Sequence, residues 1–334
     1  MDHFVEELPL IPEGRRYWLV RTSGGKYFDD FVSGSYIAIS WNEITLEDTE
    51  KGLNHITELA KSTYEQKSRP AHIANQIYKF SKEITKGDIV LIPSKKSAEI
   101  MFGEVVEDDI YEEAEAGKET EKGKKTCPFV KRKKVDWLKK VKRNQLDPYL
   151  YRLLYSQHTI SNADEYNEFI DRTVNKFYIK GNEANLILEV TQENEILAKD
   201  LFSMGTSILN LIDGYGEYTH SNINSNEIEV KLTLNSPGRI QFKGPIMVIT
   251  IIGTIFLALN GGGVEIQNES LNLNINVHTD GLIKNVTEYL DHAQKREAVD
   301  TVLQNSLKNL KAESPEELVK LLGTIPDSST KESK

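Results

Sequence analysis

A short triplet of charged residues in the second half of the chain is the pattern closest to a known catalytic chemistry. Glu229 and Lys231 are separated by one residue on the polar face of a predicted strand, and Asp213 lies upstream. In Mg²⁺-dependent nucleases, carboxylates hold the metal and a lysine positions or activates the attacking water. The same Glu-x-Lys spacing recurs at Glu65 and Glu332, so the triplet is expected by chance in a chain with 28% charged residues.

A second candidate chemistry is the binding of phosphate. The formal net charge is -10, yet residues 118–143 contain twelve basic and three acidic side chains. A basic patch on an acidic protein is typical of localised phosphate binding, and a solvated lysine-rich loop is the alternative. The basic residues just before a predicted strand are the best candidates for phosphate contacts: Lys131, Arg132, Lys133 and Lys134.

Other kinds of chemistry have little support in the sequence. The single cysteine, Cys127, excludes an internal disulfide framework. His158 and His220 are isolated, and neither a Ser/His/Asp triad nor a metal-binding cluster is apparent. We therefore expect no cofactor, with Mg²⁺ as the exception if the chain is a nuclease.

The first half of the chain reads as short strands around a helical stretch. β-branched and aromatic runs broken by Gly, Ser or Asp predict strands at residues 16–22, 36–41, 88–93 and 100–106, and a further strand carried by residues 129–130 and 135–138. An apolar stripe at helical spacing predicts helices within residues 46–80. Two shorter helices, at residues 147–154 and 164–178, close a first domain that we place at residues 1–180.

The order of these segments resembles the small PUA-like β-barrel, which is related to the EVE and YTH readers of modified bases. Such modules stand at the N-terminus of Mrr-type restriction enzymes and other phage-defence proteins. The resemblance covers residues 15–180. Its matching pieces, in the family's order, are residues 18–21, the Gly/Ser turn that follows, and residues 27–31, 37–41, 86–88, 102–105 and 135–138.

The resemblance implies a pocket in which aromatic side chains stack on a flipped or single-stranded base. Trp41 is the first candidate for the stacking wall, followed by Trp18 and Tyr17, with ordinary core packing as the alternative for each. Small polar groups near the base would come from Ser23, Gly24 and Ser40, although the family typically has glycine at the position of Ser40. Arg21 would meet a phosphate or a base edge.

The second half of the chain has a different pattern of helices and strands. Its pattern predicts helices at residues 193–212 and 281–310 and alternating strands at 227–234 and 271–277. The apolar stretch at residues 246–259 is shorter than the about 20 residues that a membrane span needs, so a buried helix is favoured over membrane insertion. We place an α/β domain of unassigned function at residues 190–325 and a disordered tail at 326–334.

Together these features predict a two-domain α+β protein: a PUA-like β-barrel with flanking helices, then an α/β domain ending in a long helix. The predicted function is recognition of DNA that carries a modified or flipped base, in a restriction or antiviral defence system. The alternatives are a Mg²⁺-dependent type IV restriction endonuclease, a membrane-associated effector, and a module for self-association or partner docking. Because the first residues show no secretory signal, we expect a cytoplasmic protein.

Overall fold

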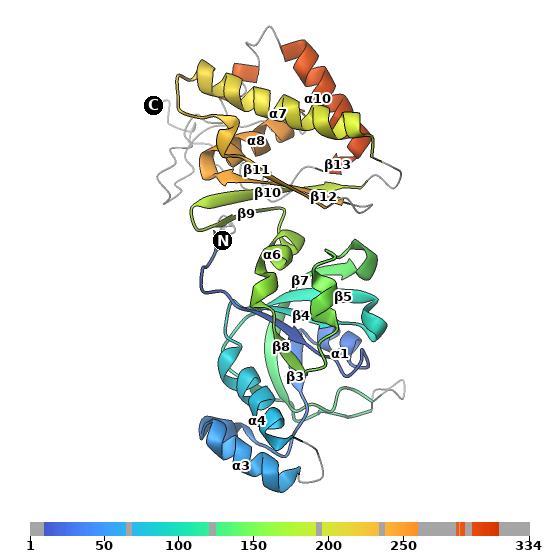
Figure 1. The fold of residues 1–334 in the computed structure, drawn as a ribbon. Coiled ribbons are helices and arrows are strands. Elements are labelled where there is room, and N and C mark those ends of the chain that lie inside the picture. The colour runs from blue at the N-terminus through green and yellow to red at the C-terminus, as the bar shows by residue number, and fades with distance from the viewer. Residues whose placement is uncertain are drawn as a thin grey trace, which may run out of the picture. The chain divides into compact units, whose positions relative to one another are not determined.

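The chain divides into two compact units in the computed structural model, which describes residues 10–64, 69–119, 125–191, 196–233, 238–259, 285–286, 288–290 and 296–313. The N-terminal unit is Gly14–Val174, and the C-terminal unit combines Met1–Glu13 with Asn175–Lys334 (Figure 1). The boundary therefore differs from the predicted residues 1–180, because the chain forms strands of the C-terminal unit on both sides of the N-terminal unit. The predicted strand at residues 271–277 and the tail at 326–334 lie outside the described residues.

The N-terminal unit is built on one curled, seven-stranded sheet. Its order is β3-β7-β5-β4-β2-β8 with β6 beside β7, and β2 and β4 are parallel while the other neighbours are antiparallel. The strands are β2 (Tyr17–Val20), β3 (Tyr36–Ile39), β4 (Ile89–Pro93), β5 (Glu99–Val105), β6 (Tyr111–Glu112), β7 (Lys131–Lys142) and β8 (Ile160–Asn162).

The long strand β7 produces the curl. Its residues 131–134 pair with β3, whereas residues 135–142 pair with β5 across an irregularity between Phe102 and Gly103. A Cβ atom at Gly103 would lie 2.5 Å from the side chains of both Trp137 and Val135. Only glycine therefore allows β5 and β7 to approach this closely at the bend.

The helical stretch predicted at residues 46–80 is helical in the structure. That stretch forms three helices, the first started by a capping box between Thr45 and Asp48. The predicted helix at residues 164–178 ends at Val174, because residues 177–180 pair with another strand. The helical elements are α1 (Phe28–Ser33), α2 (Leu46–Glu50), α3 (Leu53–Thr63), α4 (Pro70–Tyr78), the π-helical turn η1 (Lys79–Glu83), the 3₁₀ turns η2 (Lys95–Ser97), η3 (Arg143–Gln145) and η4 (Asp164–Tyr166), α5 (Leu150–Leu154) and α6 (Asn167–Val174).

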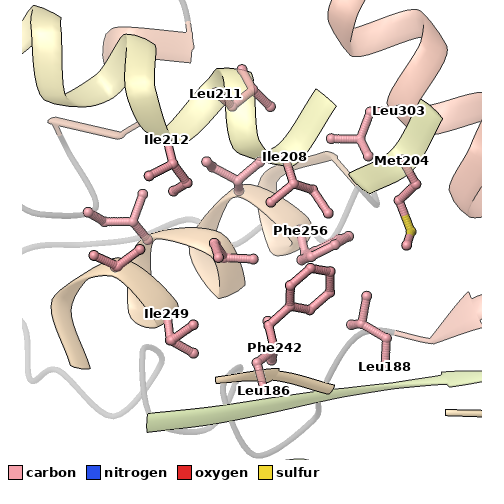
Figure 2. Close-up of a cluster of buried hydrophobic side chains, with 14 of the residues drawn as sticks. Leu186, Leu188, Met204, Ile208, Leu211, Ile212, Phe242, Ile249, Phe256 and Leu303 are labelled. Atoms are coloured by element: carbon pink, nitrogen blue, oxygen red, sulfur yellow. The ribbon is translucent and has the colours of Figure 1, made fainter. Parts of the chain in front are cut away.

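The C-terminal unit packs helices on a second sheet of order β1-β9-β10-β12-β11, with β13 beside β10. Figure 2 shows Leu186 and Phe242 of the sheet facing Ile249 and Phe256 of one helix, with Ile208 of another above them. The strands are β1 (Leu10–Ile11), β9 (Phe177–Lys180), β10 (Glu183–Val190), β11 (Glu229–Thr233), β12 (Gly238–Pro245) and β13 (Ala312–Glu313). The helices are α7 (Ala198–Tyr218), the 3₁₀ turn η5 (Ser225–Glu227), α8 (Ile246–Leu259) and α10 (Arg296–Leu310).

Two predictions for this unit can be compared with the structure. The apolar stretch is the helix α8, and its buried side chains belong to the core, as predicted. The described part of the chain contains no helix that is long and apolar enough to cross a membrane. The alternating strand predicted at residues 227–234 forms the edge strand β11, on which the apolar side chains of Val230 and Leu232 are 48% and 43% exposed.

Candidate nucleic-acid interface

Trp41 lies two residues after the end of β3, at the border of the N-terminal core. Its backbone has φ 70°, a left-handed conformation that is unusual for a bulky residue, and its side chain is half-buried. The side chain of the next residue, Asn42, donates to the Pro128 carbonyl at 2.9 Å and accepts from the Val130 amide at 3.1 Å. These bonds fix the segment that carries Trp41 against the segment that carries Phe129.

A buried lysine provides a second anchor for the same segment. The ammonium of Lys131 donates to the carbonyls of Trp41 at 2.8 Å and Ile44 at 2.7 Å. Burial lowers the pKa of this ammonium to about 8. Lys131 therefore holds the Trp41 loop from inside and is buried away from the solvent.

Two more aromatic side chains belong to the same hydrophobic cluster as Trp41. The half-buried ring of Phe129 meets that of Tyr27 edge to face, with 5.1 Å between centroids. Lys26 places its ammonium 4.9 Å from the Tyr27 ring. We call Trp41, Phe129 and Tyr27 the aromatic edge: Trp41 and Phe129 are half-buried at the border of the core, and Tyr27 is buried in the core against Phe129.

The turn before Tyr27 joins the aromatic edge to a group of exposed lysines. Ser23, Gly24 and Gly25 all have positive φ, and a Cβ atom on Gly25 would lie 2.2 Å from the backbone nitrogen of Lys95. This close approach sets Lys26 beside the connection between β4 and β5, where Lys95 and Lys96 are exposed. Of the predicted base-reading groups, Ser23 and Gly24 are exposed in this turn, and Ser40 is half-buried before Trp41.

The predicted phosphate contacts at residues 131–134 need a correction. Arg132 and Lys133 are buried, like Lys131, and the ammonium of Lys133 donates to the Asp108 carbonyl at 2.5 Å. Arg132 stacks over Tyr36 at 4.0 Å and binds Glu113 and two backbone carbonyls. Lys134 is exposed and pairs with Glu107 at 3.2 Å. The curl of β7 explains the error, because both faces of its first residues are covered.

Three predicted ligand-binding residues are hydrogen-bonded within the unit, with Tyr17 and Trp18 buried and Arg21 half-buried. The hydroxyl of Tyr17 donates to Asp171 at 2.6 Å, and the indole nitrogen of Trp18 donates to Asp88 at 2.9 Å. Arg21 donates to the carbonyls of Leu154 and Ser156, and burial lowers its pKa. Tyr17 and Trp18 are thus part of the core, and Arg21 is tied to the backbone of a neighbouring segment.

The predicted nuclease residues each have a structural partner. Asp213 accepts from the amide of Ser225 at 2.7 Å and from its hydroxyl at 2.9 Å. Glu229 lies 3.8 Å from the ammonium of Lys243 on β12, and Lys231 is paired with Gln241 in the sheet register. Within the described ranges, no group of three or more His, Cys, Asp or Glu side chains is arranged to hold a metal ion.

A hollow of about 410 Å³ lies beside buried Arg132 in the N-terminal unit. Its charged groups are largely paired with one another, since Arg132 binds Glu113 at 3.2 Å and Lys118 binds Glu115 at 2.6 Å. Burial raises the pKa of the Tyr36 hydroxyl, which lines the hollow. The mixture of paired charges offers no clear preference for an anion.

A comparison with known families gives one match, a domain of unknown function (DUF8426), over residues 17–164. No curated protein and no solved structure matches the chain. The matched segment falls within the N-terminal unit. It contains the whole aromatic edge and the lysines beside it.

Proposed function

We propose that the N-terminal unit binds DNA and recognises a modified or flipped base at the aromatic edge, within a restriction or phage-defence system. The observation that carries the proposal is the fixed, half-exposed Trp41 beside Phe129, next to a turn bordered by Lys26, Lys95 and Lys96. The assignment to a defence system is supported by the resemblance to PUA-like readers.

The chemistry of these groups suits the task. Stacking of a base on an aromatic side chain contributes about 1 to 3 kcal/mol, and every base offers a stackable face. Exposed lysines supply the salt-dependent attraction to phosphate that holds the backbone. The left-handed backbone of Trp41 is an outlier held by two sets of hydrogen bonds, and such outliers cluster at ligand-binding sites.

The test compares the binding of oligonucleotides with and without a modified base by the chain and by its Trp41→Ala variant. We expect the variant to lose discrimination between the two oligonucleotides, since the stacking contribution of about 1 to 3 kcal/mol corresponds to a factor of roughly 5 to 150 in affinity. Phe202→Ala is the matched control, because Phe202 is a 68% exposed aromatic side chain in the other unit. Absence of binding to any nucleic acid at ~50 mM salt, where phosphate contacts are strong, would refute the proposal.

A further inference from the structure

A pocket of about 510 Å³ opens at the end of β7, on the N-terminal unit. Here Lys142 is the sheet partner of Glu99, and the amide of Arg143 donates to the Ala98 carbonyl at 2.9 Å. The residues that line the pocket are Ala98, Glu99, Lys142, Arg143, Asn144 and Tyr151. None of them belongs to the aromatic edge.

The pocket carries positive charge in a fixed arrangement. The hydroxyl of Tyr151 donates to the Arg143 carbonyl at 2.8 Å, and the Arg143 guanidinium lies 5.1 Å from the centre of the Tyr151 ring. Stacking on an aromatic ring preorganises a guanidinium for binding an oxyanion. Lys142 is exposed, while the one lining carboxylate, Glu99, lies 3.7 Å from Lys140.

Basic side chains connect this pocket with the aromatic edge. Lys95 and Lys96 occupy the turn that leads into Ala98, and the same turn touches Gly25 beside Lys26. The exposed ammonium groups of Lys26, Lys95, Lys96 and Lys142 and the half-buried guanidinium of Arg143 therefore lie on segments that contact one another, from the turn before Tyr27 through the β4–β5 connection to the end of β7. A row of cations of this kind is complementary to a chain of phosphates and exceeds what a single nucleotide needs.

We propose that the pocket at Lys142 and Arg143 is a phosphodiester-binding subsite that holds the nucleic-acid backbone at a distance from the base bound at Trp41. The inference rests on the proposed function and identifies where the backbone is held. Lys131, which holds the Trp41 loop, and Lys142 are eleven residues apart on β7, and a strand rises about 3.3 Å per residue, so their backbones are at most roughly 36 Å apart. A strand longer than this can reach both sites.

The test measures binding of a 20-nucleotide strand by the double variant Lys142→Ala/Arg143→Ala over a range of salt concentrations, with the strand length chosen to exceed about 36 Å. Removing two phosphate contacts should weaken binding by about tenfold or more at ~50 mM salt. The plot of log affinity against log salt concentration has a negative slope, and the loss of two contacts should make that slope shallower by about 2. Discrimination between modified and unmodified bases should remain.

Lys61→Ala/Lys199→Ala is the control, because it removes two cations that are exposed on α3 and α7, outside the pocket. A double variant that is folded by circular dichroism but keeps the original affinity and salt slope would overturn the inference and leave the proposed function intact. Equal competition by a free mononucleotide would overturn it in favour of a nucleotide pocket. Failure of the unmodified chain to bind any strand would refute the proposed function and the subsite together.

Discussion

At the scale of single residues, Lys131 has a structural role that differs from the phosphate contact predicted from the sequence. In the sequence it is one of four consecutive basic residues that suggest phosphate binding. In the structure its ammonium supports two carbonyls of the Trp41 loop. Its burial disfavours the charged form, while removal of its hydrogen bonds would leave two acceptors without that donor.

Lys131→Met should therefore act locally. The substitution removes the cost of burying the Lys131 ammonium, a change that stabilises the fold. It also leaves the carbonyls of Trp41 and Ile44 without this donor, at a penalty of about 1 to 3 kcal/mol. Because the two effects oppose each other, we expect the free energy of unfolding to change by less than about 2 kcal/mol. Amide exchange at residues 41–44 should accelerate by tenfold or more, because the loop loses its internal anchor. Hydrogen exchange read by mass spectrometry measures both quantities. Lys134→Met, at an exposed site on the same strand, should leave the exchange of this loop unchanged.

At the scale of elements, the sequence predicted those helices and strands that are determined by residues close to one another in the chain. The hairpin of β4 and β5 and the helices within residues 46–80 follow from period, turn residues and caps. The burial of residues 131–133 does not follow from such patterns, since it requires β7 to change partners from β3 to β5. The different burial of Trp18, in the core, and Trp41, at its border, also depends on tertiary contacts that these sequence patterns do not contain.

The contact between the turn at residues 23–26 and the β4–β5 connection gives a second prediction. Gly25→Ala places a methyl group against the Lys95 backbone and strains a residue at φ +91°. Gly24→Ala adds only the strain, because nothing lies within 4 Å of its Cβ position at φ +67°. We expect Gly24→Ala to cost about 1 to 2 kcal/mol and Gly25→Ala clearly more, as measured by denaturant unfolding. Equal losses for the two variants would show that the turn does not press on Lys95.

At the scale of the whole molecule, the C-terminal unit contains a strand that precedes the N-terminal unit in the chain. Leu10 and Ile11 of β1 pair in parallel with Ile179 and Lys180 of β9. Ile11 is buried with Tyr178 and Ile187, whereas Leu10 is 53% exposed. The C-terminal sheet is thus completed by residues from both sides of the N-terminal unit.

Ile11→Ala should destabilise the C-terminal unit by about 2 to 4 kcal/mol, as large-to-small changes in a core do. The N-terminal unit should keep its stability, because Ile11 packs on Tyr178 and Ile187 of the C-terminal sheet. Hydrogen exchange followed unit by unit would separate the two effects. Leu10→Ala is the matched control and should stay within about 0.5 kcal/mol, while loss of protection in the N-terminal unit for Ile11→Ala would contradict this assignment.

The pairing of β1 with β9 also has a consequence for the order of events in folding. It closes a chain loop that includes the entire N-terminal unit, and the entropy lost on closing a loop rises with its length. Prior folding of the N-terminal unit replaces that flexible loop by a compact body with fixed ends. We therefore expect β1 to join its sheet late during refolding, as a slow phase whose rate depends on the stability of the N-terminal unit.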